Sequence, residues 1–124
     1  DRVSFVAANA SIDFFVKNNV HKHILRMGKL IKDGWIKLAK KNNIKLRTSE
    51  ITSLCTFFLD YPNKEELYTF FTKEMLKNKI IASNSIYVSY AHKKKDINKY
   101  LKICDHVFFK LNKFITKNKK IKKS

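Results

Sequence analysis

Residues that make sharp turns are rare in this sequence, which holds only two glycines and one proline among 124 residues. An all-β sandwich or barrel needs a turn about every 8–12 residues, and Gly and Pro make most of those turns. The sequence therefore favours helices with few strands. Its 44% hydrophobic content, including ten Phe, is enough for a folded core, and the length fits one domain.

Apolar residues recur at spacings of three and four over most of the chain, which is the pattern of helices that bury one face. The pair Asn18-Asn19 is expected to end the first helix. Gly28 and Gly34 fall inside the second, where each costs about 1 kcal/mol against Ala, and close packing would be a reason to keep them. The predicted helices cover residues 4–18, 20–41, 64–78 and 94–117.

Short apolar or alternating runs predict the strands. They cover residues 44–48, 52–59, 80–81 and 86–90. The first two are close enough in sequence to pair as antiparallel neighbours. The predicted order is α-α-β-β-α-β-β-α, an α+β fold in which helices cover one side of a small antiparallel-type sheet. We expect one domain over 1–118, with a connecting helix at 1–19, and a basic tail at 119–124 that frays.

The net charge is +17, from 27 Lys and Arg against 10 Asp and Glu. Such a charge attracts nucleic acid or other polyanions. Arg, the residue suited to bidentate contacts with bases and phosphates, occurs only three times, as Arg2, Arg26 and Arg47. Lys, Asn and Ile are frequent together, which also fits a general codon bias with lysines on solvated faces. Two interpretations stay open: a compositional bias and a functional anion-binding surface.

The sequence gives no support for a metal or nucleophile site. Cys55 and Cys104 lie far apart in apolar patterns without CxxC spacing, so we expect buried free thiols in a reducing compartment. His21 and His23 point to different sides of a helix, and no histidine has a partner at zinc spacing. We assign no catalytic residue, because no Gly-rich phosphate loop or GxSxG is present. No apolar run reaches the ~18 residues of a membrane span and no signal peptide is visible, so we expect a cytoplasmic protein.

One stretch has a more specific pattern. The apolar alternation of "SIYVSY" leads into Ala91-His92, and a helical pattern begins near Asp96-Ile97. This arrangement resembles the C-terminal region of class-III, fold-type-I pyridoxal-phosphate (PLP) aminotransferases, nearest to the branch of glutamate-1-semialdehyde aminomutase. "ASIDFFVKNNVHKHILRMGKLIKDGW" is similar to the helix pair after that family's phosphate-binding segment, and "SLCTFFLDYP" to its central small-domain strand. The resemblance covers nearly all of 1–118 and departs from the family at Lys93-Lys94-Lys95, where acidic residues and Thr are usual.

The resemblance implies a C-terminal fragment of a PLP-dependent aminotransferase or aminomutase that acts on an amino acid or an amino-sugar-type substrate. The Schiff-base lysine would lie in a large domain upstream, so this chain alone is expected to be inactive and to hold no PLP. Its partners would be that large domain and a second copy in a homodimer. Arg2 would meet the cofactor phosphate or a substrate carboxylate, or else be a surface arginine. Ser83 and Asn84 would line the substrate mouth, or else form a simple turn.

His92 is expected to hold the corner between strand and helix. The alternative to the enzyme fragment is a stand-alone basic α+β module that binds nucleic acid or another polyanion.

Overall fold

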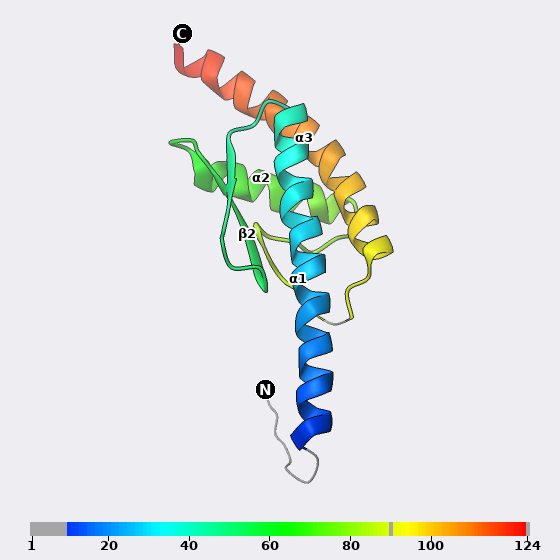
Figure 1. Ribbon diagram of the computed structural model, residues 1–124. Coiled ribbons are helices and arrows are strands. Elements are labelled where there is room, and N and C mark those ends of the chain that lie inside the picture. Colours follow the sequence, from blue (N-terminus) through cyan, green and yellow to red (C-terminus); the bar gives the residue numbers. More distant parts are fainter. Residues whose placement is uncertain (1–9, 90, 124) are drawn as a thin grey trace.

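The computed structural model describes residues 10–89 and 91–123 (Figure 1). Three helices and three short strands follow one another as α1 (Ala10–Lys41), β1 (Leu46–Thr48), β2 (Leu54–Leu59), α2 (Lys64–Lys77), β3 (Ser85–Tyr87) and α3 (Lys94–Lys123). The strands form one antiparallel sheet in the order β1-β2-β3. The predicted α+β class, with a small antiparallel sheet, is confirmed.

The predicted order of elements is wrong in its first part, because one continuous helix replaces the two helices at 4–18 and 20–41. α1 runs from Ala10 to Lys41 and passes through Asn18-Asn19 without a break. Asn is a weak helix former, not a helix breaker, and costs well under 1 kcal/mol where the hydrogen-bond ladder continues on both sides. No Gly or Pro stands at this point to interrupt the ladder. Residues 4–9 of the predicted first helix lie outside the described residues.

The predicted strand at 80–81 is also wrong. Lys79 has a positive φ of 64° and ends α2. The next backbone N–H, that of Ile80, donates to the carbonyl of Met75 at 3.0 Å and completes the end of the helix. Because this N–H is used in the cap, it does not enter a strand ladder. Ile81, in turn, is 93% exposed.

Other boundaries move by a few residues, and β3 begins and ends earlier than the predicted strand at 86–90. The last helix continues past the predicted end at 117 to Lys123. Lysine is a good helix former, and positive charge near a helix C-terminus is favourable with the helix dipole. The predicted antiparallel pairing of the first two strands is confirmed, with Arg47 opposite Phe58.

The core lies on one face of the sheet and centres on Phe57. Its ring meets those of Trp35 on α1, Phe71 on α2 and Phe108 on α3, with centroids 4.9, 5.1 and 5.9 Å apart. All three helices therefore pack on the same side of the sheet as Phe57. Its neighbour Phe58 points the other way and is 38% exposed, as the period of two in a strand requires.

Both glycines of α1 lie where another element approaches the helix closely. A Cβ on Gly28 would overlap the carbonyl oxygen of Thr52 in the turn before β2. A Cβ on Gly34 would lie 2.5 Å from the nearest side-chain carbon of Leu101 on α3. Gly28 thus lets the β1–β2 hairpin sit against α1, and Gly34 lets α3 do so. The expectation that these glycines serve close packing is confirmed.

Candidate functional site

The loop before β3 holds the two residues predicted to line a substrate mouth. The side-chain amide of Asn84 donates to the carbonyl of Phe57 at 2.9 Å, and the backbone N–H of Phe57 donates to the Asn84 carbonyl at 2.9 Å. Asn84 therefore extends the β2–β3 ladder with its side chain. Ser83 is exposed, and its hydroxyl bonds the backbone of Ser85, accepting from the N–H at 3.2 Å and donating to the carbonyl at 3.3 Å.

This geometry shows how the loop is held in place. The contact of Ser83 and Asn84 with a substrate stays a prediction. The Asn84 amide group is engaged within the sheet, as a turn residue would be, whereas Ser83 faces outward. Arg2, the predicted phosphate or carboxylate contact, lies outside the described residues.

His92 holds the corner between β3 and α3, as predicted. Its ring Nδ1 accepts a hydrogen bond from the backbone N–H of Ser89 at 3.0 Å, and its own backbone N–H donates to the Ser89 carbonyl at 3.1 Å. The His23 ring on α1 contacts the His92 carbonyl at 2.6 Å and ties this corner to the long helix. No group of three metal-ligating side chains occurs in the part of the chain that the structure describes.

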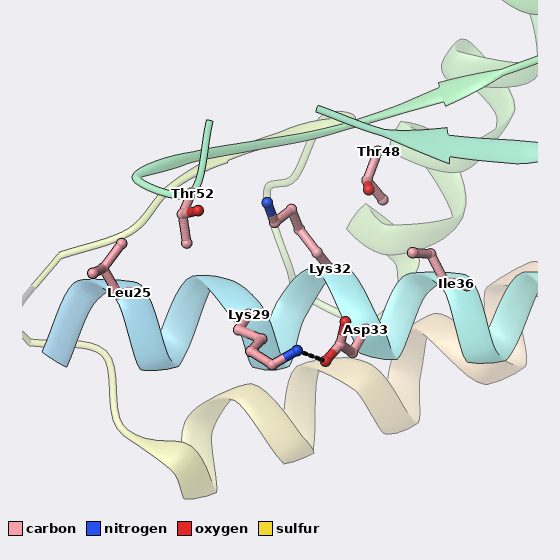
Figure 2. Close-up of a pocket in the computed structure, with 7 residues that line it drawn as sticks. All are labelled: Leu25, Lys29, Lys32, Asp33, Ile36, Thr48 and Thr52. Carbon is pink, nitrogen blue, oxygen red and sulfur yellow. Dashed lines mark hydrogen bonds and ion pairs between the residues drawn. The ribbon is translucent and has the colours of Figure 1, made fainter. Parts of the chain in front are cut away.

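A shallow groove of about 440 Å³ lies between α1 and the β1–β2 hairpin (Figure 2). Lys32 reaches across it, and its ammonium donates to the carbonyls of Ser49 at 3.2 Å and Glu50 at 3.5 Å. Lys29 and Asp33 form an ion pair of 3.0 Å along the helix at its edge. Because Lys32 already bonds the hairpin backbone, it acts here as a bridge between helix and hairpin.

The two cysteines are free and buried, as predicted. Burial raises the pKa of the Cys104 thiol to about 12 and also raises the pKa of Cys55. Since the thiolate is the nucleophile, neither residue is activated at neutral pH. Beside Cys104, the indole N–H of Trp35 donates to the Tyr100 hydroxyl at 3.2 Å, and burial raises the pKa of this tyrosine well above its usual range.

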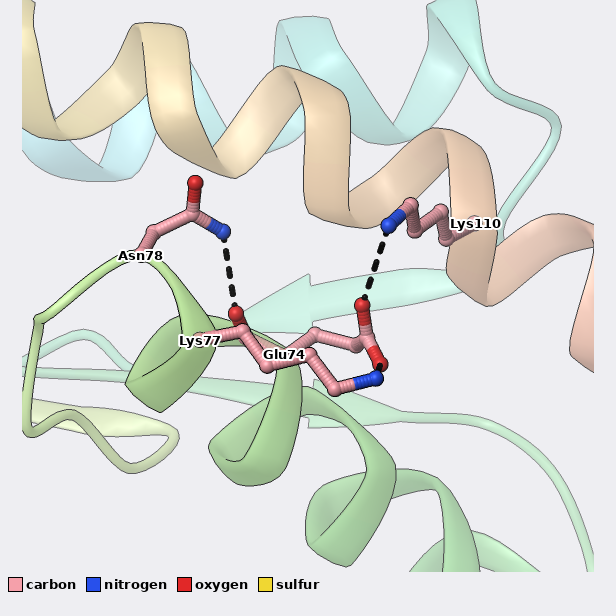
Figure 3. A network of polar contacts seen from close by, with 4 residues as sticks. All are labelled: Glu74, Lys77, Asn78 and Lys110. Atoms are coloured by element: carbon pink, nitrogen blue, oxygen red, sulfur yellow. Dashed lines mark hydrogen bonds and ion pairs between the residues drawn. The ribbon is translucent and has the colours of Figure 1, made fainter.

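Among the carboxylates that the structure describes, that of Glu74 on α2 is the most buried (Figure 3). Lys77 of the same helix lies 2.8 Å from one of its oxygens, and Lys110 of α3 lies 3.4 Å from the other. The hydrogen bond from Lys77 is the main cause that holds the pKa of Glu74 below its usual range. This cluster therefore joins α2 to α3 through one ionised carboxylate.

Sequence reasoning missed Glu74, although a signal for it exists. Phe71 follows Leu67 by four residues and Glu74 follows Phe71 by three, so Glu74 continues the buried face of α2. A charged residue in an apolar phase requires a partner, and two lysines supply it.

No helix in the described residues is long and apolar enough to cross a membrane. A scan against protein-family models gives no match, and a search of curated proteins gives none either. The fold, in contrast, is similar to part of a solved structure. This is the PLP internal aldimine form of the FumI protein of Sphingopyxis sp. MTA144, with a TM-score of 0.69 at 13% identity. The similarity covers 78% of this chain and 24% of FumI, so this chain spans about a quarter of that protein. The chain therefore has the fold of one segment of a PLP-dependent protein.

Proposed function

We propose that this chain is the C-terminal small domain of a PLP-dependent aminotransferase or aminomutase. The observation that carries the proposal is the fold match, which covers most of this chain and about a quarter of a PLP-containing protein. The sequence resemblance to class-III aminotransferases, nearest to the glutamate-1-semialdehyde aminomutase branch, is independent of that match. We propose the class-III branch, a cytoplasmic homodimer, and an amino acid or amino-sugar-type substrate on the strength of this resemblance.

We propose that the described residues do not hold PLP by themselves. A lysine that holds PLP as a Schiff base is usually enclosed, because burial lowers its pKa. Among the lysines whose side chains are described, all but Lys32 are exposed, and Lys32 donates to two backbone carbonyls. We therefore assign the cofactor to the proposed large domain. This chain would contribute the packing of the small domain and, through Ser83 and Asn84, one wall of the substrate entrance.

The coding DNA upstream of Asp1 tests this proposal. We expect an open frame long enough for a large domain, with a lysine after an apolar strand and a Ser-Thr just before Asp1. The purified longer protein should show the visible absorbance of a PLP aldimine, whereas the 124-residue chain should not. A start codon immediately before Asp1, or a stoichiometric aldimine in the short chain, would contradict the proposal.

A second candidate is a stand-alone basic module that binds nucleic acid or another polyanion, and the net charge of +17 favours it. Binding by such a module is saturable and falls steeply with salt, because each neutralised phosphate releases counterions. A titration of the chain with an oligonucleotide at several salt concentrations distinguishes the two candidates. Weak binding that does not saturate would speak against this second candidate, because the positive charge of any nonspecific polycation explains such binding.

A further inference from the structure

An open groove runs between the C-terminal half of α1 and the first part of α3. It has a volume of about 510 Å³, and most of its exposed lining is apolar. Gly34 and Leu38 of α1 and Leu101 of α3 line it with apolar surface, and the missing side chain of Gly34 brings the two helices together. This groove is separate from the loop of Ser83 and Asn84.

The groove continues along α3. A neighbouring hollow of about 310 Å³ shares Lys41, Lys102 and Asp105 with it and reaches Phe109, which is 52% exposed. From Asn98 to Phe109 the path covers about three helical turns, or roughly 16 Å at 1.5 Å per residue. A short amphipathic helix has the length and the apolar stripe to fill such a groove.

Unpaired positive charges border the groove. Lys37 and Lys102 line it, and neither has an ion-pair partner in the part of the chain that the structure describes. Lys41 is already neutralised, because its ammonium lies 2.7 Å from the carboxylate of Asp105. An occupant that matches this surface therefore presents apolar side chains to the middle and carboxylates to the two free lysines.

We propose that the groove between α1 and α3 binds an acidic amphipathic helix of a partner protein. This inference goes beyond the proposed function and does not depend on it. The lining favours a helix over nucleic acid. It contains no arginine, and of its two aromatic side chains, His106 and Phe109, the Phe109 ring is covered by the ammonium of Lys113 at 4.5 Å from the ring centroid. Nucleic acid is usually read by arginines and by open aromatic faces.

The test uses the 124-residue chain and a labelled peptide of roughly 14 residues, about four turns, with leucines at helical spacing and glutamates on both sides. We expect saturable binding in fluorescence anisotropy. A peptide of the same composition, scrambled so that no leucine stripe forms, should bind at least about tenfold more weakly, because a helix-in-groove site needs that stripe. The variant Lys37→Glu/Lys102→Glu should also weaken binding roughly tenfold, since it replaces two attractions with two repulsions.

The matched control is Lys45→Glu/Lys73→Glu, which changes net charge equally at two exposed lysines outside the groove. Circular dichroism checks that both double variants fold, and NMR shift mapping on the unchanged chain locates the peptide independently at Leu101 and Phe109. Equal binding of the scrambled peptide, or equal losses in the two double variants, would overturn the proposal. So would a single-stranded oligonucleotide of equal charge that displaces the peptide at lower concentration. Binding to this chain but not to a longer natural form would assign the groove to an internal contact and also overturn it.

Discussion

The substitution Gly28→Ala tests how closely the β1–β2 hairpin approaches α1. The added Cβ would overlap the carbonyl oxygen of Thr52 and lie 2.5 Å from its Cγ2. A backbone carbonyl cannot rotate away, so the turn before β2 has to move. That turn also accepts a hydrogen bond of 3.2 Å from the Cys55 thiol, and Lys32 bonds the hairpin nearby. Moving the turn therefore disturbs several contacts at once.

Gly34→Ala is the matched control. There the new Cβ would lie 2.5 Å from one terminal carbon of Leu101 and 2.7 Å from the other. These atoms are the ends of a flexible, half-buried side chain beside an open groove, so they can change rotamer. The two substitutions have the same chemistry in the same helix, and they differ in what stands opposite.

The magnitudes follow from two opposing terms. Replacing Gly by Ala inside a helix stabilises the protein by about 1 kcal/mol, and inserting a methyl group into a packed site costs about 1–3 kcal/mol. At Gly28 the upper end of that cost applies, so we expect a net loss of about 2 kcal/mol. For a domain of this size the loss lowers Tm by roughly 8 °C. At Gly34 the two terms nearly cancel, and we expect a change within about 0.5 kcal/mol.

Urea unfolding followed by the fluorescence of Trp35 measures both variants, because this is the only tryptophan and it lies fully buried beside Phe57. The m-value should stay the same while the midpoint moves, which identifies a change in stability alone. If Gly28→Ala proves as stable as the parent chain, the hairpin does not lie against α1 as described. Equal losses of stability at Gly28 and Gly34 would contradict the expected difference between crowding a backbone carbonyl and crowding a flexible side chain.

Three further predictions rest on single contacts. Glu74→Gln should cost about 1 kcal/mol at neutral pH, because it weakens two charge-assisted bonds. Since the pKa of Glu74 is lowered in the folded chain, its contribution to stability is present above the unfolded pKa, near the ordinary value of 4.5, and disappears as pH falls through the folded pKa. Urea midpoints of parent and variant should therefore converge in acid, and a constant gap would refute the assignment. Asn84→Ala should cost about 1 kcal/mol in the same assay, because it leaves the Phe57 carbonyl without its side-chain donor. Unchanged stability would show that this hydrogen bond does not stabilise the fold, and the Asn84 side chain could then serve to bind a ligand. Cys104 should resist a thiol reagent in the native chain and react after unfolding, because it is buried and has a pKa of about 12, so prompt reaction in the folded state would contradict its burial.

The parts of the fold that the sequence predicts well are those set by burial. The apolar phase of the last helix predicts a buried face made of Ile97, Leu101, Cys104, Phe108, Leu111 and Ile115. Four of these residues are buried, and Leu101 and Ile115 are partly buried against the core. Periodicity works here because a helix or strand with one buried face repeats that requirement along its length. Helix boundaries depend on smaller energies. Two asparagines destabilise a helix by less free energy than the continuing hydrogen-bond ladder contributes. The helix end predicted at Asn18-Asn19 from local propensity alone is therefore wrong.

The candidate site is harder to predict because its contacts join residues far apart in sequence. The bond from Asn84 to Phe57 spans 27 positions, and that from Lys110 to Glu74 spans 36. No local pattern specifies such partners. A family resemblance directed attention to Ser83 and Asn84, and the structure adds that the Asn84 amide is already engaged in the sheet. A test of substrate contact should therefore begin with the exposed Ser83.

The scarce carboxylates explain why the excess of lysine does not separate the helices. Glu74 stands between α2 and α3 and binds a lysine from each, and Asp105 of α3 binds Lys41 of α1. Hydrogen bonds from these lysines are the largest causes that lower the pKa of both carboxyl groups, so both are ionised at neutral pH. Negative charge is thus placed at the helix contacts, where lysines from two elements would otherwise repel. Apart from the half-buried Lys32, the other lysines whose side chains are described are exposed. Between α1 and α3, Lys37 and Lys102 border an open apolar groove, which is the arrangement that an acidic helical partner would recognise.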